Sequence, residues 1–61
     1  MKFAIRLNRS KINIMIADDR FENMTYTTNL DNAKIFDYFE DAKNYINSKR
    51  NPSDFSIIRI I

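Results

Sequence analysis

Large apolar residues alternate with polar or small residues twice near the start of the chain, over residues 2–7 and 11–17. A period of two is that of a β-strand with one buried face. Pairing Leu7 with Ile12 places the large apolar side chains of positions 3, 5 and 7 on the same face as those of positions 12, 14 and 16, with Met15 on the other face. It leaves residues 8–11 as a four-residue loop. A two-residue loop keeps the same faces, but the sequence has no glycine to favour such a turn. The pattern therefore predicts an antiparallel β-hairpin.

Shorter elements are expected after the hairpin. Residues 18–23 form a polar stretch typical of a turn, and residues 24–28 are rich in threonine and tyrosine, which favour a short third strand. Residues 29–32 indicate another turn. Residues 33–36 fit either a short extended piece or an early helical turn, and we expect the extended form.

One amphipathic helix is predicted over residues 38–50. Asp37 and Glu40 have the spacing of a capping box, in which two side chains bind free backbone N–H groups at a helix start. The Asn51-Pro52 pair stops the helix. Because its apolar residues form a single stripe, the helix is expected to lie on one face of a sheet. The stripe consists of Tyr38, Phe39, Ala42, Tyr45 and Ile46.

The last predicted strand, residues 54–61, carries large apolar side chains on both faces. Ile58 and Ile60 share one face, and in the alternative orientation Ile57 and Ile61 point outward. Because one helix covers only one face of a small sheet, we expect an apolar patch on the opposite face, and such patches mark interaction sites. We therefore predict a homodimer interface that consists of Ala4, Met15, Ile58 and Ile60.

Together these elements predict a single α+β domain over residues 1–61, with the order β-β-β-α-β. The sheet is expected to be a single layer, an antiparallel three-stranded meander joined by a C-terminal strand that returns parallel to a neighbour through a right-handed crossover. One helix packs on one face of it. A core this small, with no disulfide to assist it, is expected to depend on association with another chain.

The composition excludes most enzyme classes. The chain has no cysteine, histidine or glycine, which removes thiol and imidazole chemistry, thiolate zinc sites and glycine-rich phosphate loops. Asp18, Asp19 and Glu22 could ligate a divalent cation, but a solvated turn is the better interpretation because the spacing of a calcium loop is absent. We expect a non-enzymatic protein with no catalytic residue, metal, cofactor or small-molecule substrate.

The charge is banded along the chain, although the net charge of +2 is too small to indicate a nucleic-acid partner by itself. Acidic residues dominate 18–41, whereas the first 17 residues carry only basic ones. This basic stripe could be solvated edge charge, a contact for nucleic-acid phosphates or a docking surface for an acidic protein. No aromatic residue for base stacking is evident on that face. The basic residues are Lys2, Arg6, Arg9 and Lys11, with Arg59 a further candidate.

Two tyrosines lie seven residues apart at the margin of the helical stripe. Tyr38 and Tyr45 could seal the edge of the core, or they could contact a partner, because tyrosine combines a large apolar body with a polar tip. The core-edge interpretation is favoured, and both residues are kept as partner-binding candidates.

The stretch Asn32-Ala33-Lys34-Ile35-Phe36-Asp37-Tyr38-Phe39-Glu40-Asp41-Ala42-Lys43-Asn44-Tyr45-Ile46, followed by Phe55-Ser56-Ile57-Ile58-Arg59-Ile60, resembles small uncharacterised accessory proteins of phages and prophages from AT-rich bacteria. In those proteins a strand precedes a helix that starts A-x-x-F-x-x-x-E-x-A-x-x-x-I, and a short apolar strand follows. The resemblance implies a protein that binds and blocks a host protein, including those of anti-phage defence. It implies no catalytic residue.

Two functions follow as hypotheses. The first is a homodimeric, non-enzymatic inhibitor of a host protein. The second is a small nucleic-acid-binding module that uses the basic hairpin. The longest apolar run covers only residues 14–17, far short of a membrane span, so we expect a cytoplasmic protein that does not bind membranes.

Overall fold

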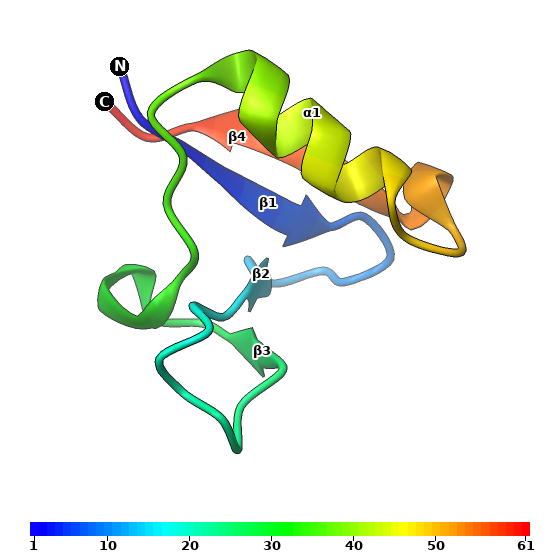
Figure 1. Ribbon diagram of the computed structural model, residues 1–61. Helices are drawn as coiled ribbons and strands as arrows, with labels where there is room; N and C mark the ends of the chain where they lie inside the picture. The colour runs from blue at the N-terminus through cyan, green and yellow to red at the C-terminus, as the bar shows by residue number, and fades with distance from the viewer.

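Four antiparallel strands form one sheet in the order β3-β2-β1-β4, and a single helix, α1, lies across it (Figure 1). The computed structural model describes residues 1–61. The α+β class, the antiparallel three-stranded meander and the helix on one sheet face are all confirmed. The elements are β1 (Phe3–Leu7), β2 (Met15–Ile16), β3 (Tyr26–Thr27), the 3₁₀ turn η1 (Leu30–Asn32), α1 (Phe39–Asn47), the 3₁₀ turn η2 (Pro52–Asp54) and β4 (Phe55–Arg59).

The direction of the last strand differs from the prediction. Strand β4 runs antiparallel to β1, whereas a strand parallel to a neighbour was predicted. The cause is the segment 33–36, which is extended as expected. It bonds to the sheet through the bridges Ala17↔Ala33 and Phe3↔Phe36 and carries the chain back to the start of β1. From there α1 runs in the same direction as β1, so β4 returns against it (Figure 1).

The hairpin forms, but its register differs by two residues from the prediction. Arg6 faces Met15, and the Leu7 N–H donates to the Ile14 carbonyl over 2.8 Å. A shift of two keeps every side chain on its predicted face, while it lengthens the loop and leaves Ile12 60% exposed. The predicted burial of Ile12 is therefore wrong.

The physical reason for the longer loop is the Arg6 guanidinium. It donates to the Ser10 carbonyl over 2.8 Å and to the Asn13 side-chain oxygen over 3.0 Å. The Ser10 hydroxyl in turn accepts from the Ile12 N–H over 3.2 Å. The Ser10 carbonyl and the Ile12 N–H are thereby satisfied within the loop, without a partner on the opposite strand.

The helix begins later and ends earlier than predicted. Tyr38 is its N-cap residue and makes no side-chain cap bond, so the capping box predicted for Asp37 and Glu40 is wrong. The bridge at Phe36 places Asp37 beside Lys2, which binds its carboxylate instead. At the other end, the Ser48 hydroxyl donates to the Tyr45 carbonyl over 2.6 Å and ends the helix.

The predicted third strand is only Tyr26–Thr27, and the predicted turn after it is η1. The Asn29 side chain caps η1 by accepting from the Asp31 N–H over 3.0 Å. No helix is long and apolar enough to cross a bilayer.

Apolar clusters form on both faces of the sheet. The helix-side cluster is centred on Ile5 and Ile16 from the strands and on Ala42 and Ile46 from α1. Ala42 is fully buried, which lets the helix lie close to the sheet. The opposite face, here called the outer face, holds a second cluster that consists of Ala4, Met15 and Ala33 with Ile58 and Ile60 packed against them.

Candidate functional site

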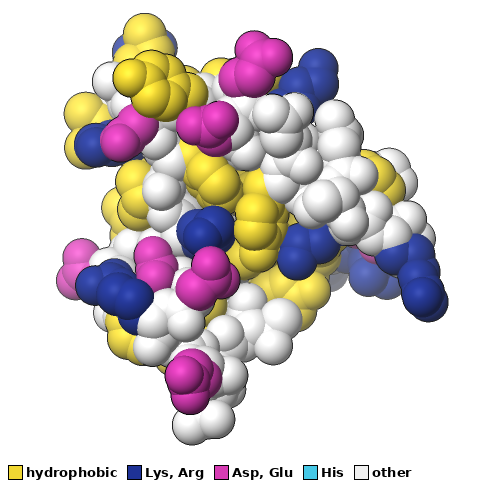
Figure 2. Space-filling view, in the orientation of Figure 1, with side chains coloured by type: hydrophobic (Ala, Val, Ile, Leu, Met, Phe, Trp, Pro, Cys, Tyr) yellow, Lys and Arg dark blue, Asp and Glu magenta, His cyan; other side chains and the backbone are white.

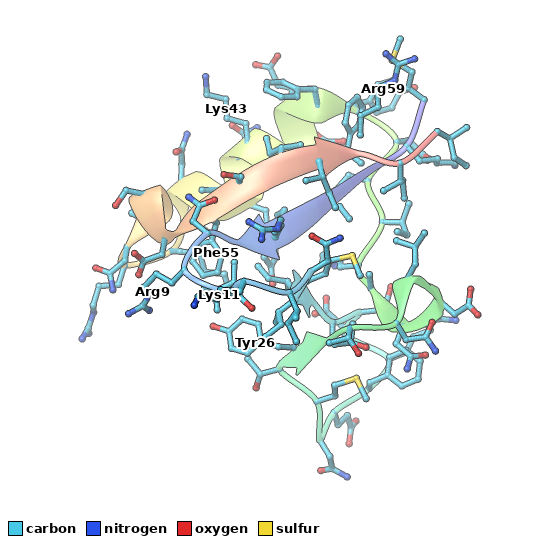
Figure 3. The ribbon with its side chains drawn as sticks, turned by 180° about the vertical axis from the view of Figure 1, so that it is seen from behind. Arg9, Lys11, Tyr26, Lys43, Phe55 and Arg59 are labelled. Carbon is cyan, nitrogen blue, oxygen red and sulfur yellow. The ribbon has the colours of Figure 1, made fainter.

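The outer face carries the four residues predicted for a dimer interface. Ala4 and Met15 are already buried within the chain, at 0% and 4% exposure, so they offer almost no surface to a partner. They form a packing layer that is buried by their own neighbours. Ile58 and Ile60 lie over this layer and remain half-buried. No helix covers them, because α1 lies on the far side of the sheet (Figure 3).

A second apolar surface, here called the terminal patch, lies where the chain begins and ends. Both termini lie beside the start of α1 (Figure 1), and the Lys2 N–H donates to the Ile61 carbonyl over 3.4 Å. The Phe39 ring meets the Phe3 ring edge-on, with 5.9 Å between centroids, yet half of Phe39 remains exposed. The patch consists of Met1, Tyr38, Phe39 and Ile61, all large apolar or aromatic and all exposed.

The predicted basic stripe does not form a single surface. Lys2 pairs with Asp37 near the start of β1, and Arg6 is held in the hairpin loop. Arg9 lies beyond the other end of β1, with its guanidinium 3.4 Å from the Asp54 carboxylate.

Two further cations belong to the same prediction. Lys11 is exposed in the hairpin loop. Arg59 is exposed and donates to the Ile61 carbonyl over 3.5 Å. It lies far from Arg9 and Lys11 (Figure 3).

The two tyrosines take different places. Tyr38 is 69% exposed in the terminal patch. Tyr45 lies at the core edge, as favoured, with its ring centroid 5.6 Å from that of Phe36. Two ammonium groups approach the Tyr45 ring, those of Lys34 at 5.5 Å and Lys49 at 4.7 Å from the centroid.

In the turn that was considered as a cation site, Asp18 and Asp19 form hydrogen bonds within the chain. The Asp18 carboxylate accepts from the Arg20 backbone N–H over 2.9 Å, and this bond lowers the pKa of Asp18 below its usual value. The Asp19 carboxylate accepts from the Lys34 ammonium over 3.0 Å, which raises the pKa of Lys34. No group of three or more side chains in the structure is placed to hold a metal ion.

A hollow that no sequence pattern predicted lies on the helix side of the sheet, and it is here called the basic groove. Helix α1 packs on β1 and β4, and β2 and β3 extend beyond its cover (Figure 1). The floor of the hollow is Leu7, Tyr26 and Phe55. Its rim carries Arg9, Lys49 and Arg50, and its volume is about 210 Å³.

The groove extends past Tyr26 along the exposed edge strand. A neighbouring hollow of about 350 Å³ shares that ring and is lined further by Ile14, Thr27 and Thr28. Figure 2 shows hydrophobic surface left open below α1, with basic side chains on either side of it. The named groove residues come from three strands, the hairpin loop and the segment after α1, so only the strand order together with the helix position could have brought them together.

No protein-family model, curated protein or solved structure matches the chain.

Proposed function

We propose that the protein is a non-enzymatic binding protein that forms a homodimer through its outer face and acts by occupying another protein. The observation that carries this proposal is that Ile58 and Ile60 remain half-buried on the outer face, with no second layer over them (Figure 3). An isolated sheet needs an apolar layer on each apolar face, and a second copy presenting the same face supplies one.

The occupant is a second copy because the outer face is self-complementary in composition. Ile58 projects from β4 and Ile60 from the segment just after it, and Ile35, 39% exposed, extends the apolar surface on the β2 side of β1. These three isoleucines carry no charge and flank a layer of small or flexible side chains. The charged Arg6 lies on the same face opposite Met15, but its guanidinium is held by the Ser10 carbonyl and the Asn13 side chain at the hairpin-loop end of the cluster.

We assign the binding of the target protein to the terminal patch. This patch lies at the end of the molecule where both termini meet the start of α1 (Figure 1), and its side chains are exposed. Exposed aromatic rings such as those of Tyr38 and Phe39 are favoured at the centres of protein interfaces. The resemblance to phage accessory proteins supports a target in the host cytoplasm, with inhibition as the result of binding.

Sedimentation equilibrium at micromolar concentration tests the dimer. We expect a species of twice 7.3 kDa for the wild type and a folded monomer for Ile35→Asp and Ile60→Asp. The matched control is Ile12→Asp, which places the same charge on an exposed isoleucine in the hairpin loop. Circular dichroism establishes that each variant is folded. A wild type that sediments as a monomer contradicts the proposal.

Affinity capture from host lysate tests the target surface. The wild type is expected to retain a stoichiometric protein that Tyr38→Asp fails to retain, while Met24→Asp, on the opposite part of the molecule, retains it. The purified target should then lose activity when the wild type is added. Equal capture by Tyr38→Asp, or a target whose activity is unchanged by binding, rejects the assignment.

A further inference from the structure

We propose that the basic groove binds single-stranded nucleic acid, with a base against Tyr26 and Phe55 and the phosphates at Arg9, Lys49 and Arg50. This activity is separate from the protein-binding function and does not rest on the dimer. It also differs from the predicted hairpin stripe, because only Arg9 is common to both surfaces.

The floor of the groove has the shape and chemistry for a base. Tyr26 faces Ile16 across β2 and β3, so its ring lies on the helix side, yet α1 does not reach it and 43% of it is exposed. Phe55 faces Leu7 across β1 and β4 on the same side. The hollow is open to solvent, and an aromatic ring at such a site offers a flat surface on which any base can stack.

The rim has the charge that phosphates require. Arg9, Lys49 and Arg50 bring three positive charges, and Asp54 is the one acid in the lining. The Asp54 carboxylate faces the Arg9 guanidinium at 3.4 Å, so its charge is partly compensated. A phosphate group can take the place of this carboxylate as the partner of Arg9, because both accept hydrogen bonds from a guanidinium.

The end of α1 lies at this rim, and its carbonyl groups would repel an anion if they were free. Three of the last four are hydrogen-bonded here. The Ser48 and Lys49 N–H groups donate to the carbonyls of Asn44, Tyr45 and Ile46, over 2.9 to 3.3 Å. Lys49 and Arg50 follow directly and oppose the remaining negative end of the helix dipole.

The aromatic rings favour nucleic acid over an acidic peptide. An acidic peptide would use the cations and leave Tyr26 and Phe55 without a specific contact. A nucleotide uses both, because its base stacks while its phosphate is bound. Further along the helix, the ammonium groups of Lys34 and Lys49 both approach the Tyr45 ring, so a second aromatic ring lies beside the groove cation Lys49.

The test uses a fluorescein-labelled twelve-nucleotide oligothymidylate and measures anisotropy as protein is added. We expect saturable binding at 50 mM NaCl. Three phosphate contacts give a slope of about −2 in a plot of log affinity against log salt, or a roughly 20-fold weakening at 200 mM. Absence of saturable binding at 50 mM NaCl overturns the proposal.

Charge variants locate the site. K49E/R50E and K43E/R59E change the net charge by the same amount, but Lys43 and Arg59 lie far from the groove residues Arg9, Tyr26 and Phe55 (Figure 3). We expect K49E/R50E to weaken binding more than tenfold and K43E/R59E to weaken it less than threefold. Equal losses in the two variants show that overall charge alone attracts the oligonucleotide, and they reject the groove.

Ring variants test the stacking. Tyr26→Leu keeps an apolar side chain and should weaken binding roughly tenfold, whereas Tyr26→Phe should restore wild-type affinity. The matched control is Tyr38→Leu, which removes an exposed tyrosine at the other end of the molecule and should have no effect. Oligoglutamate of equal charge is expected to compete poorly. If it competes as well as oligothymidylate, the groove recognises acidic peptides and the proposal fails.

Discussion

Small side chains set the distance between the layers of this molecule. Ala42 on the helix and Ala4 on β1 are both completely buried, one on each side of the sheet. Ile5 is the one large side chain that is fully buried, at 0% exposure. A domain of this size has few such residues, so each contributes a large share of the free energy of unfolding.

The substitution Ile5→Val should therefore cause a measurable loss of thermal stability. Removal of one buried methyl group costs about 1 kcal/mol and should lower Tm by roughly 4–8 °C in a domain of this length. Thermal unfolding followed by circular dichroism gives the shift. Ile12→Val removes the same group from a side chain that is 60% exposed and should leave Tm unchanged. Equal shifts for the two variants would show that Ile5 is not the centre of the core.

The Lys2–Asp37 pair predicts a dependence on pH. The hydrogen bond from the Lys2 ammonium lowers the pKa of Asp37 below its ordinary 3.8 in the folded chain. The pair therefore contributes its full stabilisation when the pH is above the pKa of Asp37 in the unfolded chain. This contribution is lost as the pH falls through the pKa of Asp37 in the folded chain. Asp18, whose pKa is lowered chiefly by the Arg20 N–H, acts in the same direction.

Tm should consequently fall as the pH is lowered from about 5 to about 2, and the fall should be shallower in Asp37→Asn. Asp41→Asn is the control, because Asp41 is an exposed helix residue outside every ion pair of the structure. Identical pH profiles for wild type and Asp37→Asn would show that the pair with Lys2 does not persist in solution.

At the scale of elements, the alternation of residues determines faces but not register. A strand that slips by two residues keeps the same side chains on the same face, so the pattern is equally consistent with Leu7 opposite Ile12 or opposite Ile14. The deciding contacts belong to Arg6, whose position in the pattern indicated only a polar face. In the same way, Asp37 and Glu40 have the spacing of a capping box. Only the folded structure places Asp37 beside Lys2, which binds its carboxylate, so that Asp37 does not cap the helix.

Arg6→Ala tests whether these contacts fix the hairpin. The substitution removes the bonds to the Ser10 carbonyl and the Asn13 side chain, and each is worth about 1 kcal/mol or somewhat more because the donor is charged. Urea unfolding should show a loss of about 2 kcal/mol. Arg9→Ala breaks only an exposed ion pair and should lose less than about 1 kcal/mol. Comparable losses of stability in Arg6→Ala and Arg9→Ala would show that the Arg6 bonds do not fix the hairpin loop.

At the scale of the whole molecule, the order of the strands decides which surfaces exist. The amphipathic helix and the two-faced last strand were sufficient to predict one covered and one uncovered face. The basic groove could not be predicted, because it requires β3 at one edge, β4 at the other and the helix displaced toward β4. Those placements follow from the bridge between Phe3 and Phe36, a contact between residues far apart in the chain.

A dimer that buries Ile58 and Ile60 of the outer face makes the stability of the fold depend on protein concentration. For a dimer that unfolds to two chains, each tenfold rise in protein concentration adds about 1.4 kcal/mol to the stability of the dimer. With the unfolding entropy of two chains of this length, Tm should rise by about 5 °C per tenfold. Calorimetry at 10 and 100 μM measures the rise, and Ile60→Asp, if it folds, should show none. A wild-type Tm that is the same at both concentrations means that the outer face stays in contact with water, and the homodimer is then excluded.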